Sequence, residues 1–191
     1  GIKGHGRGLA LVRAIAEHGL GLLPRDFAAA PADVPQARAA RLVCGGVYAR
    51  MSGEDFVVMS LAGSGNKGIT ASVPLAIMGE ARGLPPERVD EALALACLIT
   101  VLTTGKLGSL SAVCGGSNAA GAGLAAGLVL LAGGGEREIS LSLDNMVGNV
   151  SGMVCDGAKI GCGLKTMTAV DAAFRAASLA MSGVGIPFTD G

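Results

Sequence analysis

Three of the five cysteines in this 191-residue chain lie in turns that contain glycine. Cys114 precedes two glycines, Cys155 begins a Cys-Asp-Gly turn, and Cys162 lies between two glycines. Glycine lets the backbone approach a bulky ligand, and the amides exposed there can hydrogen-bond to the sulfides of an iron–sulfur cluster. This pattern is compatible with a metal or cluster role for the three thiols, but cysteine is more commonly buried as a small hydrophobic side chain.

The other two cysteines, Cys44 and Cys97, are predicted to be ordinary core residues, and Cys97 lies within an apolar stretch at 93–102. An odd number of cysteines and no recognisable secretory signal argue against a disulfide framework and favour a reducing compartment, the cytoplasm. The sequence has no Cys-x-x-Cys pair and two histidines in all. Zinc ribbons, thioredoxin-like sites and histidine-rich metal sites are therefore unsupported.

A second segment with chemical potential is the glycine-rich stretch 63–68, which contains Lys67 and fits the pattern G-x-G-x-x-G. A dinucleotide-binding fold would need a long helix directly afterwards, but Pro74 falls within its first two turns, and no convincing βαβ unit follows. A simpler interpretation is an anion-binding loop in which backbone amides and Lys67 receive a carboxylate. An ordinary turn with a solvent-exposed lysine remains the alternative.

Composition excludes several classes of protein. The chain has 15 basic and 15 acidic residues, five aromatic residues and 32 glycines. Its apolar content excludes disorder, the irregular glycine spacing excludes collagen, and the lack of basic excess and aromatic residues disfavours nucleic-acid binding. The uncharged stretch 107–135 is cleanly apolar from residue 119 only, which is shorter than the roughly 20 residues of a membrane span. We therefore predict one globular domain, residues 1–191, with no membrane role.

The elements that would position these residues are mostly helical. Helices are predicted at 7–18, 69–82, 86–103, 119–131 and 166–181. Gly19 and Gly21 are expected to end the first helix, and Pro74 to start or kink the second. Residues 24–40 are interpreted as a loop or an interrupted helix.

Two further segments leave room for strands. Residues 56–61 fit a strand or the end of a buried helix, and residues 136–143 alternate as a strand does. The predicted fold is mainly α: a compact helical domain with glycine-rich turns and one or two short strands at most, with α+β as the alternative. Gly121, Gly123 and Gly127 are expected to let helices pack closely.

Three segments together resemble one family. They are 59–70 (MSLAGSGNKGIT), 111–123 (SAVCGGSNAAGAG) and 149–165 (NVSGMVCDGAKIGCGLK). They are similar to the L-cysteine desulfidase family (UPF0597-type), which is related to the α-subunit of iron–sulfur L-serine dehydratase. The resemblance covers roughly residues 45–180, and the cysteine spacings of 41 and 7 residues agree with the desulfidase branch.

This resemblance implies a 4Fe–4S cluster held by Cys114, Cys155 and Cys162. The fourth iron would have no protein thiolate and would act as a Lewis acid on the leaving thiol or hydroxyl. The implied enzyme is a cytoplasmic lyase of cysteine catabolism that eliminates sulfide from L-cysteine, or water from L-serine, to give pyruvate and ammonia. Pyridoxal phosphate is not implied.

The resemblance assigns Ser64 and Asn66 as substrate-binding candidates, and the interpretation of 63–68 as an anion-binding loop adds Lys67. It does not choose the general base, for which Lys159, Asp156, Ser151 and Lys67 are the candidates. Lys159 and Lys165 flank Cys162 and are either solvated or positioned to neutralise a thiolate cluster.

Chains of this family are longer and carry an N-terminal cysteine motif that this sequence lacks. We therefore expect it to represent the C-terminal, cluster-bearing portion of a longer enzyme. Its expected partners are a small amino-acid substrate and the N-terminal portion or a companion chain, and a homodimer is compatible with the sequence. The competing hypothesis is a non-catalytic fragment, structural or binding a small molecule, whose cysteines are simply buried.

Overall fold

The computed structural model describes residues 5–29 and 34–187, and these residues are mostly helical. In chain order the elements are α1 His5–Leu22, α2 Arg25–Ala28, α3 Pro35–Ser52, α4 Gly65–Ala81, α5 Pro86–Leu107, the π-helical turn η1 Gly116–Ala120, α6 Gly121–Leu131, α7 Glu136–Val150 and α8 Cys162–Met181. Within the described ranges, β-structure is limited to two isolated bridges. The predicted mainly α class is confirmed.

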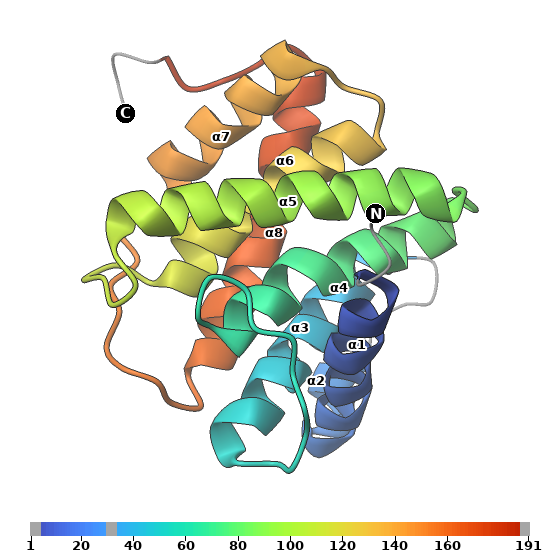
Figure 1. Ribbon diagram of the computed structural model, residues 1–191, viewed down its shortest axis with the longest axis vertical. Helices are drawn as coiled ribbons and strands as arrows, with labels where there is room; N and C mark the ends of the chain where they lie inside the picture. The colour runs from blue at the N-terminus through green and yellow to red at the C-terminus, as the bar shows by residue number, and fades with distance from the viewer. Residues whose placement is uncertain (1–4, 30–33, 188–191) are drawn as a thin grey trace.

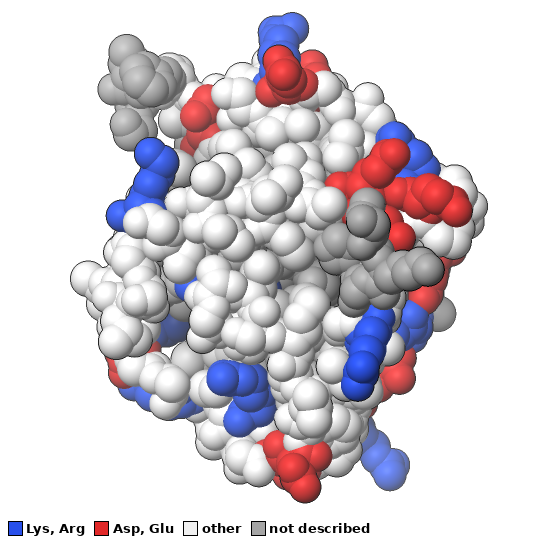
Figure 2. All heavy atoms as spheres, viewed as in Figure 1, with Lys and Arg blue, Asp and Glu red and all other residues white. Residues whose placement is uncertain are grey.

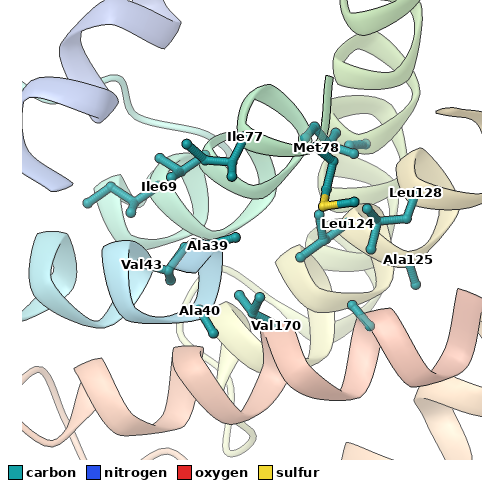
Figure 3. Close-up of a cluster of buried hydrophobic side chains, with 14 of the residues drawn as sticks. Ala39, Ala40, Val43, Ile69, Ile77, Met78, Leu124, Ala125, Leu128 and Val170 are labelled. Carbon is teal, nitrogen blue, oxygen red and sulfur yellow. The ribbon is translucent and has the colours of Figure 1, made fainter. Parts of the chain in front are cut away.

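The core lies where α3, α4, α6 and α8 meet, with α5 crossing in front of them and α1 and α7 packed on opposite sides (Figure 1). Figure 3 shows Ile77 and Met78 of α4 in one cluster of buried side chains with Val43 of α3, Leu124 of α6 and Val170 of α8. All five side chains are at most 3% exposed. Aliphatic burial at these crossings therefore provides the main stabilisation of the bundle.

The prediction that Gly19 and Gly21 end the first helix is wrong, because α1 continues to Leu22. Gly19 lies instead where α1 crosses α3. A Cβ atom on Gly19 would lie 1.9 Å from the carbonyl oxygen of Gly45. Glycine is needed here because two helix backbones touch, and a helix tolerates glycine when packing compensates for its low propensity.

Small residues also join α5 and α6, as predicted. A Cβ atom on Gly123 would lie 2.4 Å from the carbonyl oxygen of Ala96, and one on Gly127 would lie 3.0 Å from that of Ala92. Gly121 similarly accommodates the end of the Met146 side chain. The helices therefore approach closely without large interlocking side chains.

The predicted strand at 136–143 is wrong, because these residues form the first half of α7. The buried positions continue as Ser142, Met146 and Val150, which is helical spacing that a short alternating window hides. The Glu138 carboxylate accepts a hydrogen bond from the Gly135 amide at 2.9 Å and caps this helix. Residues 56–61 are also not a regular strand; they form an irregular segment that ends in a bridge between Leu61 and Ser64.

Several helix boundaries differ from the prediction. Helix α4 begins at Gly65, inside the glycine-rich stretch, and Pro74 lies within it. Helix α5 starts at Pro86 as predicted but extends to Leu107. Helix α8 begins at Cys162, four residues earlier than expected.

Residues 24–40 hold the short helix α2 and the first residues of α3, and residues 30–33 of that segment lie outside the described residues. No helix in the described part of the chain is both long and apolar enough to cross a membrane.

Candidate active site

Three separate parts of the fold meet at one cavity of about 340 Å³. Cys114, Cys155 and Cys162 all line it, although 48 residues of sequence separate the first from the last. The first turn of α4 lines the same cavity, with Ser64, Asn66 and Lys67. The structure therefore brings together every predicted cluster ligand and every predicted substrate-binding residue, in a volume typical of small-molecule sites.

Cys114 and Cys155 are positioned by a backbone bridge between two loops. Val113 and Val154 form an isolated antiparallel bridge. The Cys114 amide donates to the Met153 carbonyl at 2.8 Å, and the Cys155 amide donates to the Ala112 carbonyl at 2.9 Å. Because side chains alternate along extended backbone, both cysteines lie on the face opposite the two valines, as diagonal neighbours.

Cys162 is the first residue of α8, and its amide donates to the Lys159 carbonyl at 2.8 Å. Its sulfur lies 3.6 Å from the Gly157 carbonyl oxygen. One turn along α8, Lys165 donates from Nζ to the Val154 carbonyl at 3.0 Å and pairs with Asp156. These bonds hold the loop that carries Cys155 against the helix that carries Cys162.

Ser117, which no sequence pattern singled out, contacts both segments that carry these cysteines. Its hydroxyl oxygen is fully buried and lies 3.5 Å from Cys114 Sγ, 2.8 Å from Met153 Sδ and 3.1 Å from the Lys165 carbonyl oxygen. A serine hydroxyl has one proton to donate, so these acceptors compete for it. Ser117 therefore couples the position of Cys114 to the loop at 153 and to α8.

The other wall of the cavity is the N-terminal end of α4. Ser64 is the N-cap, and its hydroxyl accepts from the Lys67 amide at 3.4 Å. Lys67 itself is 5% exposed, and its Nζ donates to the Ala62 carbonyl at 3.4 Å. Burial lowers the pKa of Lys67, and the nearby Cys114 thiol opposes that shift. The alternative interpretation, an ordinary turn with a solvent-exposed lysine, is thus excluded.

Arg50, on the last turn of α3, also lines the cavity and was missed by the sequence analysis. Its Nη1 donates to Asn66 Oδ1 at 3.1 Å. An arginine at the end of a helix is common because it suits the helix dipole, so the sequence carries no signal of this role. Among the described residues that line the cavity, Arg50 and Lys67 are the basic side chains, and none is acidic. The cavity therefore suits an anionic ligand.

The remaining candidates for the general base lie outside this lining. Asp156 pairs with Lys159 at 2.6 Å and with Lys165, and these two ammonium groups hold the pKa of Asp156 well below its usual range. Ser151 is exposed at the end of α7. Cys44 and Cys97 do not line the cavity, and burial raises the pKa of both thiols.

The three cavity cysteines are thiol donors of the type that holds iron–sulfur clusters. Within the described ranges, no three histidine, cysteine or acidic side chains are grouped closely enough to hold one metal ion. All three cysteines line one cavity, and cysteine thiolates are the ligands that hold a 4Fe–4S cluster. Cys114, Cys155 and Cys162 therefore fit a cluster in residue type and placement.

Comparison with known proteins gives the family. The model of the serine dehydratase alpha chain matches residues 9–190. This chain belongs to the serine dehydratase alpha chain family. It is 46% identical over 143 residues to a UPF0597 protein of Caldanaerobacter subterraneus subsp. tengcongensis, an alignment that covers 75% of this chain and 34% of that protein. It is 40% identical over 192 residues to a UPF0597 protein of Nitratidesulfovibrio vulgaris, an alignment that covers 100% of this chain and 43% of that protein.

This chain thus aligns to 34% of the length of the first relative and 43% of the second. No solved structure gives a significant match to it.

Proposed function

We propose that this chain is the cluster-binding part of a lyase that eliminates sulfide from L-cysteine, with water from L-serine as the related reaction. The observation that carries the proposal is the meeting of Cys114, Cys155 and Cys162 with a basic, acid-free wall at one cavity. Membership of the serine dehydratase alpha chain family supports a lyase.

In this proposal the three cysteines hold a 4Fe–4S cluster. When bound, the cluster supplies Lewis acidity toward the leaving thiol or hydroxyl. The chain's own residues bind and orient the substrate. The basic wall attracts the substrate carboxylate, while the Ser64 hydroxyl and the Asn66 amide orient the amino acid in front of the thiolates.

Lys67 is the proposed general base. Its burial lowers its pKa, which raises the fraction of neutral amine that can accept a proton. The α-proton of the substrate moves to Lys67 Nζ, the Cβ–S bond breaks, and the sulfur leaves as sulfide with the bonding pair. The resulting aminoacrylate tautomerises and takes up water to give pyruvate and ammonia, a step that needs no further group from the chain.

The whole enzyme is proposed to include more polypeptide than this chain. Relatives are more than twice its length, and this chain aligns to 43% of the Nitratidesulfovibrio vulgaris protein. We therefore expect full turnover when the chain is combined with a companion segment that corresponds to the rest of such a relative.

Anaerobic reconstitution with iron and sulfide tests the cluster. We expect about four irons per chain, together with a broad visible absorption band. Cys155→Ser should lose the band, whereas Cys97→Ser, which alters a cysteine outside the cavity, should retain it. A wild-type chain that binds no iron under these conditions would contradict the proposal and favour the competing hypothesis of a non-catalytic fragment.

The reaction is tested with the reconstituted chain and its companion segment. Sulfide and pyruvate released in equal amounts from L-cysteine are expected, and a higher kcat/KM for L-serine would instead identify a dehydratase. Iron binding without turnover of either substrate would limit the chain to a cluster-binding role and contradict the lyase proposal.

A further inference from the structure

The guanidinium group of Arg50 lies against the start of α4 because residue 65 is glycine. A Cβ atom on Gly65 would lie 2.5 Å from Arg50 Nε and 3.0 Å from Arg50 Cδ. The guanidinium thus lies beside the first residue of the helix, at the wall that also carries Asn66 and Lys67. The absence of a side chain at Gly65 is what allows this placement.

Most of the hydrogen-bonding capacity of Arg50 is unused within the described residues. Nη1 donates to Asn66 Oδ1, and this is the one hydrogen bond of the guanidinium in that part of the chain. Six ion pairs occur among the described residues, and none involves Arg50 or Lys67. Two basic groups and a helix N-terminus thus share one wall, and no carboxylate of the described residues pairs with either group. Such a wall favours an anion.

We infer that Arg50 binds the carboxylate of the α-amino-acid substrate and so selects substrates that carry one. This inference rests on the proposed function for the identity of the ligand. Arginine keeps its charge in proteins and presents paired N–H groups that match a carboxylate, whereas a buried lysine readily loses its proton. Arg50 therefore provides the fixed charge for binding, and Lys67 is left to move a proton.

Asn66 links the two halves of this arrangement. It accepts from Arg50 through Oδ1, and its Nδ2 lies 3.8 Å from Met51 Sδ, a weak acceptor. The hydrogen bond from Arg50 thus fixes the orientation of the Asn66 side-chain amide, with Oδ1 toward Arg50 and the Nδ2 donor on the other side. Loss of Arg50 therefore removes the fixed charge and also releases the amide that orients the substrate.

The test measures binding of non-reactive probes to the cluster-reconstituted chain by calorimetry. L-Alanine and propionate carry the carboxylate but no leaving group, and ethylamine lacks the carboxylate. Wild-type chain should bind the first two and not ethylamine. Arg50→Gln should weaken binding of both carboxylates by about 10- to 100-fold, and Arg50→Lys by less, because lysine keeps the charge but loses the paired geometry.

Two further variants separate binding from folding. Gly65→Ala keeps every charge but displaces the guanidinium, so it should weaken carboxylate binding as Arg50→Gln does. Arg82→Gln removes a positive charge from the exposed far end of α4 and should bind both carboxylates like wild type. Thermal unfolding of all variants identifies any that fail to fold.

The outcomes distinguish this inference from the proposed reaction. If Arg50→Gln and Gly65→Ala are folded and bind propionate as wild type does, the inference is overturned, whatever the enzyme catalyses. If both lose propionate while the wild-type assembly turns over neither cysteine nor serine, the carboxylate site stands and the lyase proposal falls. In an active assembly, Arg50→Lys should raise KM for L-cysteine more than it lowers kcat.

Discussion

At the residue scale, burial of Lys67 is expected to lower the stability of the fold while it serves the proposed function of this side chain. It is 5% exposed, and burying an ammonium group without a counter-charge is costly. We expect Lys67→Met to lower the rate of sulfide release by about 100-fold or more, as loss of a general base does. The free energy of unfolding should stay the same or rise, because methionine fills similar space without a charge.

Urea unfolding and a sulfide assay of the same preparations check this expectation. Lys106→Met, on the exposed end of α5, is the control and should change neither quantity. A folded Lys67→Met protein with wild-type turnover would show that the α-proton goes to another group.

The sequence predicted some of the site residues and not others. The sequence predicted that the three glycine-flanked cysteines belong with the loop at 63–68, and the structure places both at one cavity. Arg50 and Ser117 were missed because their roles depend on contacts between distant segments. Gly65 makes room for Arg50, and Ser117 reaches Met153 and Lys165 across a helix interface, which no local pattern reports.

At the element scale, the crossing of α1 and α3 depends on glycine in a way that can be measured. Gly19→Ala would place Cβ 1.9 Å from the Gly45 carbonyl oxygen, so the helices must separate. We expect a loss of about 1–3 kcal/mol or more of unfolding free energy, as for overpacked cores. Gly21→Ala is the matched control, because a Cβ atom there meets nothing within 4 Å.

The control should be stabilised by about 0.5–1 kcal/mol, since alanine favours helix in the same element. Denaturant unfolding of both variants gives the comparison. Equal stability of the two variants would contradict the close backbone crossing.

Helix α8 supplies a pH-dependent test. Burial raises the pKa of Asp171 above its ordinary value of 3.8, against the opposing effect of Arg175 and Arg41. Between 3.8 and the raised pKa the folded chain binds more protons than the unfolded chain, so stability falls as pH rises through this window. Asp171→Asn should therefore gain stability relative to wild type as pH rises through it.

Urea unfolding midpoints of wild type and Asp171→Asn at several pH values from 3 to 7 measure this difference. Asp55→Asn, at an exposed position, controls for the loss of one negative charge. A difference between Asp171→Asn and wild type that does not vary with pH would contradict the burial of this carboxylate.

The elements themselves were predictable where the apolar pattern was long and punctuated by proline. Pro86 marks the start of α5, as predicted. The pattern failed at 136–143, where a short window of alternation concealed a helix whose buried face continues to Met146 and Val150. It also failed at Gly19. Glycine has a low helix propensity, but this glycine lies inside a helix because it lets two helix backbones touch. At Gly19 a tertiary contact overrode local preference.

At the scale of the whole molecule, the outer face of α5 is apolar although nothing in the described structure covers it. Leu98, Val101 and Leu102 are 62%, 48% and 62% exposed, and they lie at helical spacing on one side. Leu110, in the loop beside the cavity, is 100% exposed. Figure 2 shows a broad uncharged area across the front of the molecule, where Figure 1 places α5. Such a surface is typical of a protein interface.

The length of the relatives indicates the occupant of this face. Because the Nitratidesulfovibrio vulgaris relative is more than half unmatched by this chain, we expect the unmatched part of such a protein to cover α5 and the mouth of the cavity. That part, expressed as a separate polypeptide, should form a one-to-one complex with this chain. The paired substitution Leu98→Glu and Leu102→Glu should weaken the complex at least tenfold, because it places charges in an apolar contact.

Analytical ultracentrifugation and titration calorimetry measure the complex. The control pair is Val147→Glu and Leu179→Glu, at comparably exposed apolar positions on α7 and α8, and it should leave the affinity unchanged. A homodimer that the α5 pair abolishes, without binding of the companion polypeptide, would assign this face to a second copy of the chain instead. Equal effects of the two pairs would show that exposed apolar area alone, rather than the face beside the cavity, determines association.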